Sequence, residues 1–238
     1  MKGEFKVKVT IIHGQNHKGS TYHLAHLLAD QLEAEVTEFF LPKDFNATCI
    51  GCGQCFLKSE EKCPHAAALK PLTEALDAAD VIILASPVYV YHVTGAMKSF
   101  LDHYAYRWMI HRPEEKMFSK QLVCLSTAAG AGMKSTTKDL ADSAYFWGIA
   151  KIYRYGAAVR ATSWKDVDEA LKLRLERDMQ KLAKIIKRRD KKVQPGLKTK
   201  GFFYLVRQIH RHGGIEADCA YWHEKGWDAK KRPWKKDN

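Results

Sequence analysis

Four cysteines lie close together in one short segment of the chain. They are Cys49, Cys52, Cys55 and Cys63, with the spacing C-x2-C-x2-C-x7-C, and Pro64 directly follows the last of them. Thiolate ligands this close in sequence can hold a [4Fe-4S] cluster, and a proline after the final cysteine is typical of ferredoxin sequences. Four thiolates also suit a tetrahedral zinc ion. Unmetallated thiols are the third alternative, and the spacing leaves all three open.

A polar loop after the first apolar run of the chain could bind an anion. It reads GQNHKGST at residues 14–21 and stands where a strand is expected to give way to a helix. Backbone N–H groups and the helix dipole favour an anion at such a place. The candidate binding residues are Gln15, His17, Lys18, Gly19, Ser20 and Thr21. An ordinary capped turn is the alternative interpretation.

The type of anion follows from what this loop lacks. Its spacing is close to the nucleotide-binding loop G-x-x-x-x-G-K-[ST], but Ser20 stands where the lysine belongs. No aspartate follows the apolar run that ends at Leu84, so the magnesium ligand of an NTPase is missing. The loop is also not the dinucleotide sequence G-x-G-x-x-G. These differences favour a monophosphate.

A second loop offers a flat apolar surface. Val81–Leu84 is a continuous apolar run typical of a buried parallel strand, and Ser86-Pro87 ends it. The residues that follow are Pro87, Val88, Tyr89 and Val90. In open α/β sheets ligands bind beyond the carboxyl ends of the strands, so this apolar loop suits a flat ring. The alternative is that these residues only close the end of the sheet.

A third loop is made of small residues. Thr127, Ala128, Ala129 and Gly130 follow another apolar strand, and small side chains let a ligand approach the backbone closely. Three such loops would converge on one edge of the sheet, where they would hold a phosphate, a flat ring and a close backbone contact. Together these features describe a site for FMN. His92, just past the second loop, could protonate a reduced substrate or could simply begin a helix.

Strands and helices alternate along the chain and must position these loops. Strands are expected at residues 6–13, 35–40, 81–84, 121–126 and 151–159, with apolar helical periodicity between them. This alternation predicts an α/β fold, in which helices cover both faces of a five-stranded parallel sheet. Right-handed crossovers permit the flavodoxin-like strand order 2-1-3-4-5. Ser163 and Asp166 predict a capping box for a last long helix.

Two of these stretches resemble a known family. TIIHGQNHKGSTYHLAHLLADQL resembles the phosphate loop and first helix of the flavodoxin-like NADPH-dependent FMN reductases, which typically read G-S-P-R-x-x-G-N-T. DVIILASPVYVYHVTGAMKSFLDH resembles their second motif, and CIGCGQC is similar to cysteine-bearing members. The resemblance covers about Lys6 to Val159. The chain departs from the family pattern at Gln15 for serine, Asn16 for proline and His17 for arginine.

The resemblance implies a function and its site. FMN would place its phosphate on Gln15, His17, Ser20 and Thr21, its ring on Pro87–Val90, and Thr127–Gly130 would border the ring. NAD(P)H would be the cosubstrate, and a quinone-like or other small electrophilic compound would be the acceptor. A homodimer is expected. The cysteine spacing also resembles iron–sulfur flavoproteins of the same fold, so an electron carrier with a cluster is an alternative. A non-enzymatic flavin sensor, or a module that binds nucleic acid or protein, is a second alternative.

Length and charge set the domain organisation. A chain of 238 residues with 46% apolar content suits one packed domain, expected at residues 1–193, with an extension at 194–238. From Lys184 onward there are 16 basic and 6 acidic residues, which hold most of the net charge of +12. No nucleic-acid motif accompanies this charge, so a solvated surface or a positive rim for an anionic cofactor is favoured over nucleic acid. Its many aromatic residues must pack on the same subunit, a second subunit or the cofactor.

Further expectations concern location and single residues. No run of about 18 apolar residues occurs, so no membrane span is expected. The N-terminal residues lack the features of a signal peptide, which predicts a cytoplasmic protein with reduced cysteines. Cys124 is expected in the core, and Cys219 is expected to be structural. Asp102 and His103 are expected to face solvent or a subunit interface.

Overall fold

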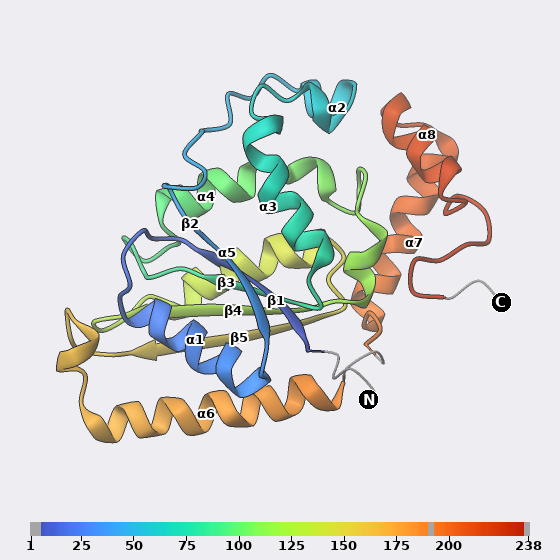
Figure 1. Ribbon diagram of the computed structural model, residues 1–238. Coiled ribbons are helices and arrows are strands. Elements are labelled where there is room, and N and C mark those ends of the chain that lie inside the picture. The colour runs from blue at the N-terminus through green and yellow to red at the C-terminus, as the bar shows by residue number, and fades with distance from the viewer. Residues whose placement is uncertain (1–5, 190–192, 236–238) are drawn as a thin grey trace.

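One parallel sheet of five strands organises the molecule (Figure 1). The computed structural model describes residues 6–189 and 193–235. The strands are β1 (Lys8–His13), β2 (Glu35–Phe40), β3 (Val81–Ala85), β4 (Gln121–Ala128) and β5 (Lys151–Ala158). They lie in the order β2-β1-β3-β4-β5, with all neighbours parallel. The predicted flavodoxin-like α/β fold is confirmed.

Helices connect and cover the strands. The α-helices are α1 (Ser20–Leu32), α2 (Gln54–Leu57), α3 (Ala66–Ala78), α4 (Gly95–Asp102), α5 (Met133–Phe146), α6 (Glu169–Arg188), α7 (Leu197–His212) and α8 (Glu216–Glu224). Short 3-10 turns are η1 (Glu60–Lys62), η2 (Ala105–Arg107), η3 (Glu115–Ser119) and η4 (Trp164–Asp166). Helices α1 and α6 cover one face of the sheet, and α3, α4 and α5 cover the other (Figure 1).

The two faces of the central strands fill two apolar cores. In β3, Ile83 packs in the core under α1 and α6, whereas Ile82 and Leu84 pack in the core under α3, α4 and α5. Successive side chains of a strand point to opposite faces, so a strand covered on both sides must be apolar throughout. The continuous apolar run at Val81–Leu84 therefore places β3 at the centre of the three layers.

Two predictions about helix ends were wrong. The predicted capping box at Ser163 does not begin α6. The Asp168 carboxylate accepts the N–H of Leu171 at 3.0 Å and caps this helix, whereas Ser163 caps the short turn η4. The helix after β3 was expected to continue to Trp108, but α4 ends at Asp102. A carboxylate one residue before the helix satisfies its free N–H groups directly, and an intervening turn removes Ser163 from that place.

The C-terminal extension folds back on the same chain. Phe203, Val206 and Trp222 share a buried cluster with Met109 and Phe118, which precede β4. Helices α7 and α8 therefore lie at the end of the sheet where the strands begin (Figure 1). Of the partners that the sequence allowed for these aromatic residues, the same subunit is the one observed. The domain boundary between residues 193 and 194 stays a prediction, and residues 190–192 lie outside the described part.

No helix within residues 6–189 and 193–235 combines the length and the apolar content that a membrane span needs. The expected absence of a spanning helix therefore holds for the described chain. The cytoplasmic location stays a prediction.

Candidate active site

A pocket lies where the carboxyl ends of the central strands meet. Most of the residues predicted for the cofactor line it: Gln15, His17, Gly19, Ser20, Thr21, Pro87, Val88, Tyr89, Thr127, Ala128 and Ala129. Lys18, Val90 and Gly130 belong to the same loops but lie outside the lining. The structure therefore brings the three loops together at one site, as the parallel topology requires.

One end of the pocket is built to receive an anion. Helix α1 begins after Gly19, and no side chain caps its N-terminus, so its first N–H groups face the pocket side uncapped. The hydroxyl of Thr21 is buried and lies 2.6 Å from the hydroxyl of Thr127 across the pocket. His17 and Lys18 are exposed at the rim. Hydroxyl donors, free backbone N–H groups and the positive end of a helix dipole together suit a phosphate.

Hydrogen bonds fix the first loop against the second. The Gly14 N–H donates to the carbonyl of Ala85 at 2.8 Å, and the Thr94 hydroxyl donates to the carbonyl of Gly14 at 2.6 Å. The Thr94 N–H in turn donates to the hydroxyl of Ser86 at 3.1 Å. The amide of Gln15 donates to the hydroxyl of Tyr89. The phosphate end and the aromatic wall of the pocket are thus held in one fixed arrangement.

The aromatic wall ends in a tight two-residue turn. Tyr89 and His92 exchange backbone hydrogen bonds of 2.9 and 3.0 Å, and both residues between them have positive φ, 48° at Val90 and 66° at Tyr91. Positive φ is costly for a β-branched residue, and such strain gathers at functional sites. The Val90 side chain is 93% exposed. The turn therefore presents an apolar tip beside the pocket.

The loop before α5 packs tightly against this wall. Gly132 has a φ of +96°, and a Cβ there would lie 2.5 Å from Cγ1 of Val88 and 3.3 Å from Cα of Tyr91. Only glycine permits both the backbone conformation and the close approach. The second and third loops therefore share one surface.

Comparisons with known proteins agree with this geometry. The family model for NADPH-dependent FMN reductase matches residues 7–162. The chain belongs to this family. The FMN reductases of this family are NAD(P)H-dependent flavin enzymes, so the chain is an FMN-dependent NAD(P)H oxidoreductase.

Individual relatives of this FMN reductase carry several names. An "Iron-sulfur flavoprotein" of Archaeoglobus fulgidus is 29% identical over 188 residues, which is 75% of this chain and 79% of the relative. An "NADPH azoreductase" of a Bacillus species is 28% identical over 127 residues, covering 53% and 61% of the two chains. Among solved structures, an azoreductase of Bacillus anthracis has a TM-score of 0.57 at 13% identity, covering 74% of this chain and 98% of its own. That similarity shows the shared fold.

Some residues that line the pocket of this FMN reductase were not predicted. They are His13, Tyr22, Ala85, Val159, Ala161 and Thr162. His13 and Ala85 end β1 and β3, and Val159 follows β5, so the rule that ligands lie beyond strand ends would have found them. The fourth loop, after β5, was missed because its small residues form no recognisable motif.

His13 forms a polar group beneath the pocket. Its Nε2 lies 3.0 Å from a carboxylate oxygen of Glu38, and Nε2 of His26 lies 2.9 Å from the same oxygen. Burial lowers the pKa of His13 below its usual value, although the hydrogen bond to Glu38 raises it. His13 is therefore neutral at pH 7 and adds no charge to the anion site.

The proton-donor candidate His92 lies beside the pocket. It does not belong to the pocket lining, and its side chain is 65% exposed. Its Nδ1 lies 2.9 Å from the carboxylate of Asp139. The catalytic role of His92 stays a prediction, and the structure adds an ion-pair partner for its ring.

The four clustered cysteines lie away from the pocket. Cys49 and Cys52 are exposed, whereas Cys55 and Cys63 are half-buried. Burial raises the pKa of the Cys55 thiol, and the nearby thiols of Cys63, Cys49 and Cys52 raise it further. A zinc ion would need its four sulfurs about 3.8 Å apart. In the described residues, no group with ligand atoms within 4.8 Å of one another contains more than one of these cysteines, so a four-cysteine zinc site is not formed.

Proposed function

We propose that this FMN reductase passes hydride from NAD(P)H by way of FMN to a small electrophilic acceptor such as a quinone. The observation that carries the proposal is the single pocket in which an uncapped helix N-terminus faces an apolar, aromatic wall. FMN, when bound, supplies the hydride chemistry, while the protein supplies orientation and electrostatics. The distribution of polar and apolar groups in the pocket fits a phosphorylated flat ring system.

The polar end of the pocket would hold the phosphate. The hydroxyls of Ser20 and Thr21 and the N–H groups that begin α1 are the donors nearest the buried part of the pocket. Gln15, His17 and Lys18 would complete this end from the rim. Since His17 and Lys18 are exposed, they add positive charge or donors without closing the pocket.

The apolar wall would hold the ring. Pro87, Val88 and Tyr89 line the pocket, and Val90 at the tip of the turn would cover the edge of the ring. Thr127 to Gly130 would border its other side. The α7–α8 extension packs at the opposite end of the sheet, so it does not cover this wall. Nicotinamide and acceptor would therefore reach the ring in turn from the same open face.

An anaerobic titration tests the proposal. We expect the purified chain to bind one equivalent of FMN, to be bleached by NADPH or NADH, and to be reoxidised by a benzoquinone. Running both nicotinamides separately measures the preference between them. If the chain binds no FMN, or if the bound FMN is not reduced by either nicotinamide, the proposed function is wrong.

The choice of acceptor needs its own comparison. A quinone and an azo dye are offered at equal concentration to the reduced enzyme, because one relative is named an azoreductase. We expect faster reoxidation by the quinone, since the open apolar wall accepts a flat ring without further contacts. Faster reoxidation by the azo dye would change the substrate class and leave the enzyme class as it stands.

A cluster-bearing electron carrier is the second candidate. The name of one relative and the position of three thiols around Cys55 favour it. A [4Fe-4S] cluster is larger than a single ion and is bound by cysteines that are further apart. Iron and sulfide analysis of chain purified without oxygen decides between the candidates. Four iron atoms per chain would support the carrier, and flavin without iron would support the simple oxidoreductase.

The remaining expectations concern partners. Membership of an enzyme family displaces the non-enzymatic sensor and the nucleic-acid module that the basic tail had suggested. A homodimer stays a prediction, and light scattering on the FMN-loaded chain measures it.

A further inference from the structure

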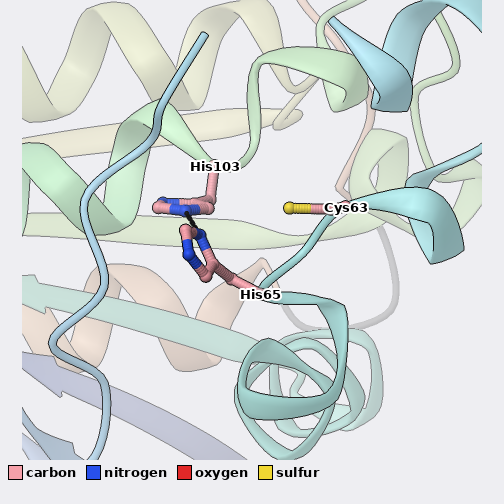
Figure 2. A group of neighbouring side chains, drawn as sticks. All are labelled: Cys63, His65 and His103. Atoms are coloured by element: carbon pink, nitrogen blue, oxygen red, sulfur yellow. Dashed lines mark hydrogen bonds between the residues drawn. The ribbon is translucent and has the colours of Figure 1, made fainter. Parts of the chain in front are cut away.

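Cys63, His65 and His103 form a compact group outside the flavin pocket (Figure 2). The sulfur and one ring nitrogen of each histidine all lie within 4.8 Å of one another. Cys63 ends η1, His65 precedes α3, and His103 follows α4, so two distant segments supply the group. His103 is 5% exposed, which contradicts the expectation that it faces solvent or a subunit interface.

The ring of His103 is already oriented as metal-binding histidines are. Its Nδ1 lies 2.7 Å from the carbonyl oxygen of Ser99, which can only accept, so the neutral ring carries its proton there. Its Nε2 therefore directs a lone pair toward Nδ1 of His65, 2.9 Å away. A backbone carbonyl that fixes the tautomer in this way is the usual outer partner of a metal-bound histidine.

The spacing of the three donor atoms is close to that of a bound ion. Two nitrogens on a tetrahedral zinc ion are about 3.3 Å apart, and a nitrogen and a sulfur about 3.6 Å. The nitrogens of His65 and His103 would separate by a few tenths of an ångström as the ion replaces their shared proton. Cys63 and His65 lie on a connection between short elements, which can make this adjustment more easily than the buried His103.

The surroundings give a cation a way in. A surface hollow beside the group is lined by Cys63 and His103 together with the acidic residues Glu60, Glu61 and Glu74. Nearby carboxylates attract a divalent cation, and one thiolate with two imidazoles is a donor set that suits zinc. The open hollow leaves a fourth ligand position for water.

We propose that Cys63, His65 and His103 bind a zinc ion, which fastens the cysteine-bearing segment to the end of α4. This site is independent of the flavin pocket and of the proposed function. It shares Cys63 with the cluster alternative, so a full cluster and this zinc site exclude each other. The histidines distinguish the two, because a four-cysteine cluster does not use them.

Zinc binding to the reduced, chelator-stripped chain tests the proposal. A competition titration with a chromophoric chelator is expected to give one tight equivalent in the unmodified chain. Cys63→Ser and His65→Ala should each weaken binding at least about tenfold, because losing an outer-shell partner alone already costs roughly 10–100-fold. His212→Ala, which removes an exposed histidine of α7, is the matched control and should bind like the unmodified chain.

Two further measurements keep the result interpretable. Cys52→Ser should retain the zinc affinity, since Cys52 lies outside the group. Zinc should raise the melting temperature of the unmodified chain and of Cys52→Ser but not of His65→Ala, whose folding is checked by circular dichroism. The proposal is overturned if the unmodified chain holds no zinc, if His65→Ala binds normally, or if binding depends on Cys52.

Discussion

Arg112 and Asp218 form a buried ion pair that joins the C-terminal extension to the cysteine-bearing segment. The two side chains are 7% and 1% exposed. The guanidinium of Arg112 also donates to the carbonyls of Cys55 and Phe56, and Nδ1 of His111 lies 2.7 Å from the second carboxylate oxygen. One acidic residue of α8 thus fixes an arginine that holds two carbonyls of α2.

Removing Asp218 should be costly. Asp218→Ala leaves the charge of Arg112 buried without its partner, and such losses destabilise a protein by about 3–5 kcal/mol. Urea unfolding of the variant and the unmodified chain measures the effect. Asp142→Ala breaks an exposed pair with Lys138 and should cost at most about 1 kcal/mol. Similar small losses in both variants would show that the buried pair has no special weight.

Thr21→Val should weaken FMN binding. The substitution keeps the shape of the side chain but removes the hydroxyl that lies 2.6 Å from Thr127. The expected loss of binding free energy is about 1–3 kcal/mol. Titration by quenching of flavin fluorescence measures it. Thr73→Val, which loses a hydroxyl contact with Tyr104 away from the pocket, is the control. Equal FMN affinity in Thr21→Val and the unmodified chain would remove this hydroxyl from the site.

Gly132→Ala should disturb the wall of the pocket. The new Cβ would meet Val88 at 2.5 Å in a backbone conformation with a φ of +96°. We expect a loss of stability of about 1–3 kcal/mol, together with weaker FMN binding. Gly130→Ala is the control for stability, because a Cβ at that position meets nothing within 4 Å. Thermal unfolding of both variants gives the comparison, and equal melting temperatures would contradict the expected strain.

His13 should make stability depend on pH. Burial lowers the pKa of His13 in the folded protein, so the unfolded chain binds the proton more readily. Stability is therefore expected to fall as the pH drops below about 6.5, the usual histidine value, toward the lower folded pKa. His13→Gln should flatten this part of the profile, whereas His212→Gln should not. Urea unfolding between about pH 8 and 5 measures it, and parallel profiles for all three proteins would exclude His13 as the cause.

The sheet and the three loops were predictable because they follow from local patterns. The continuous apolar run at Val81–Leu84 requires cover on both faces, and parallel strands bring their carboxyl-end loops to one edge. The pairing of Arg112 with Asp218, 106 residues apart, has no local pattern. The burial of His103 was missed for a related reason. Helical periodicity suggested a helix to Trp108, but α4 ends at Asp102 and packing against Phe45 then decides where the ring lies.

The extension and the flavin pocket lie at opposite ends of the same sheet. Phe203 and Trp222 pack beside Phe118, before β4 begins, whereas Thr127 lines the pocket where β4 ends. The two parts are therefore modular. The charged outer surface of α7 and α8 can vary, or carry a fused label or tether, while the redox pocket keeps its chemistry.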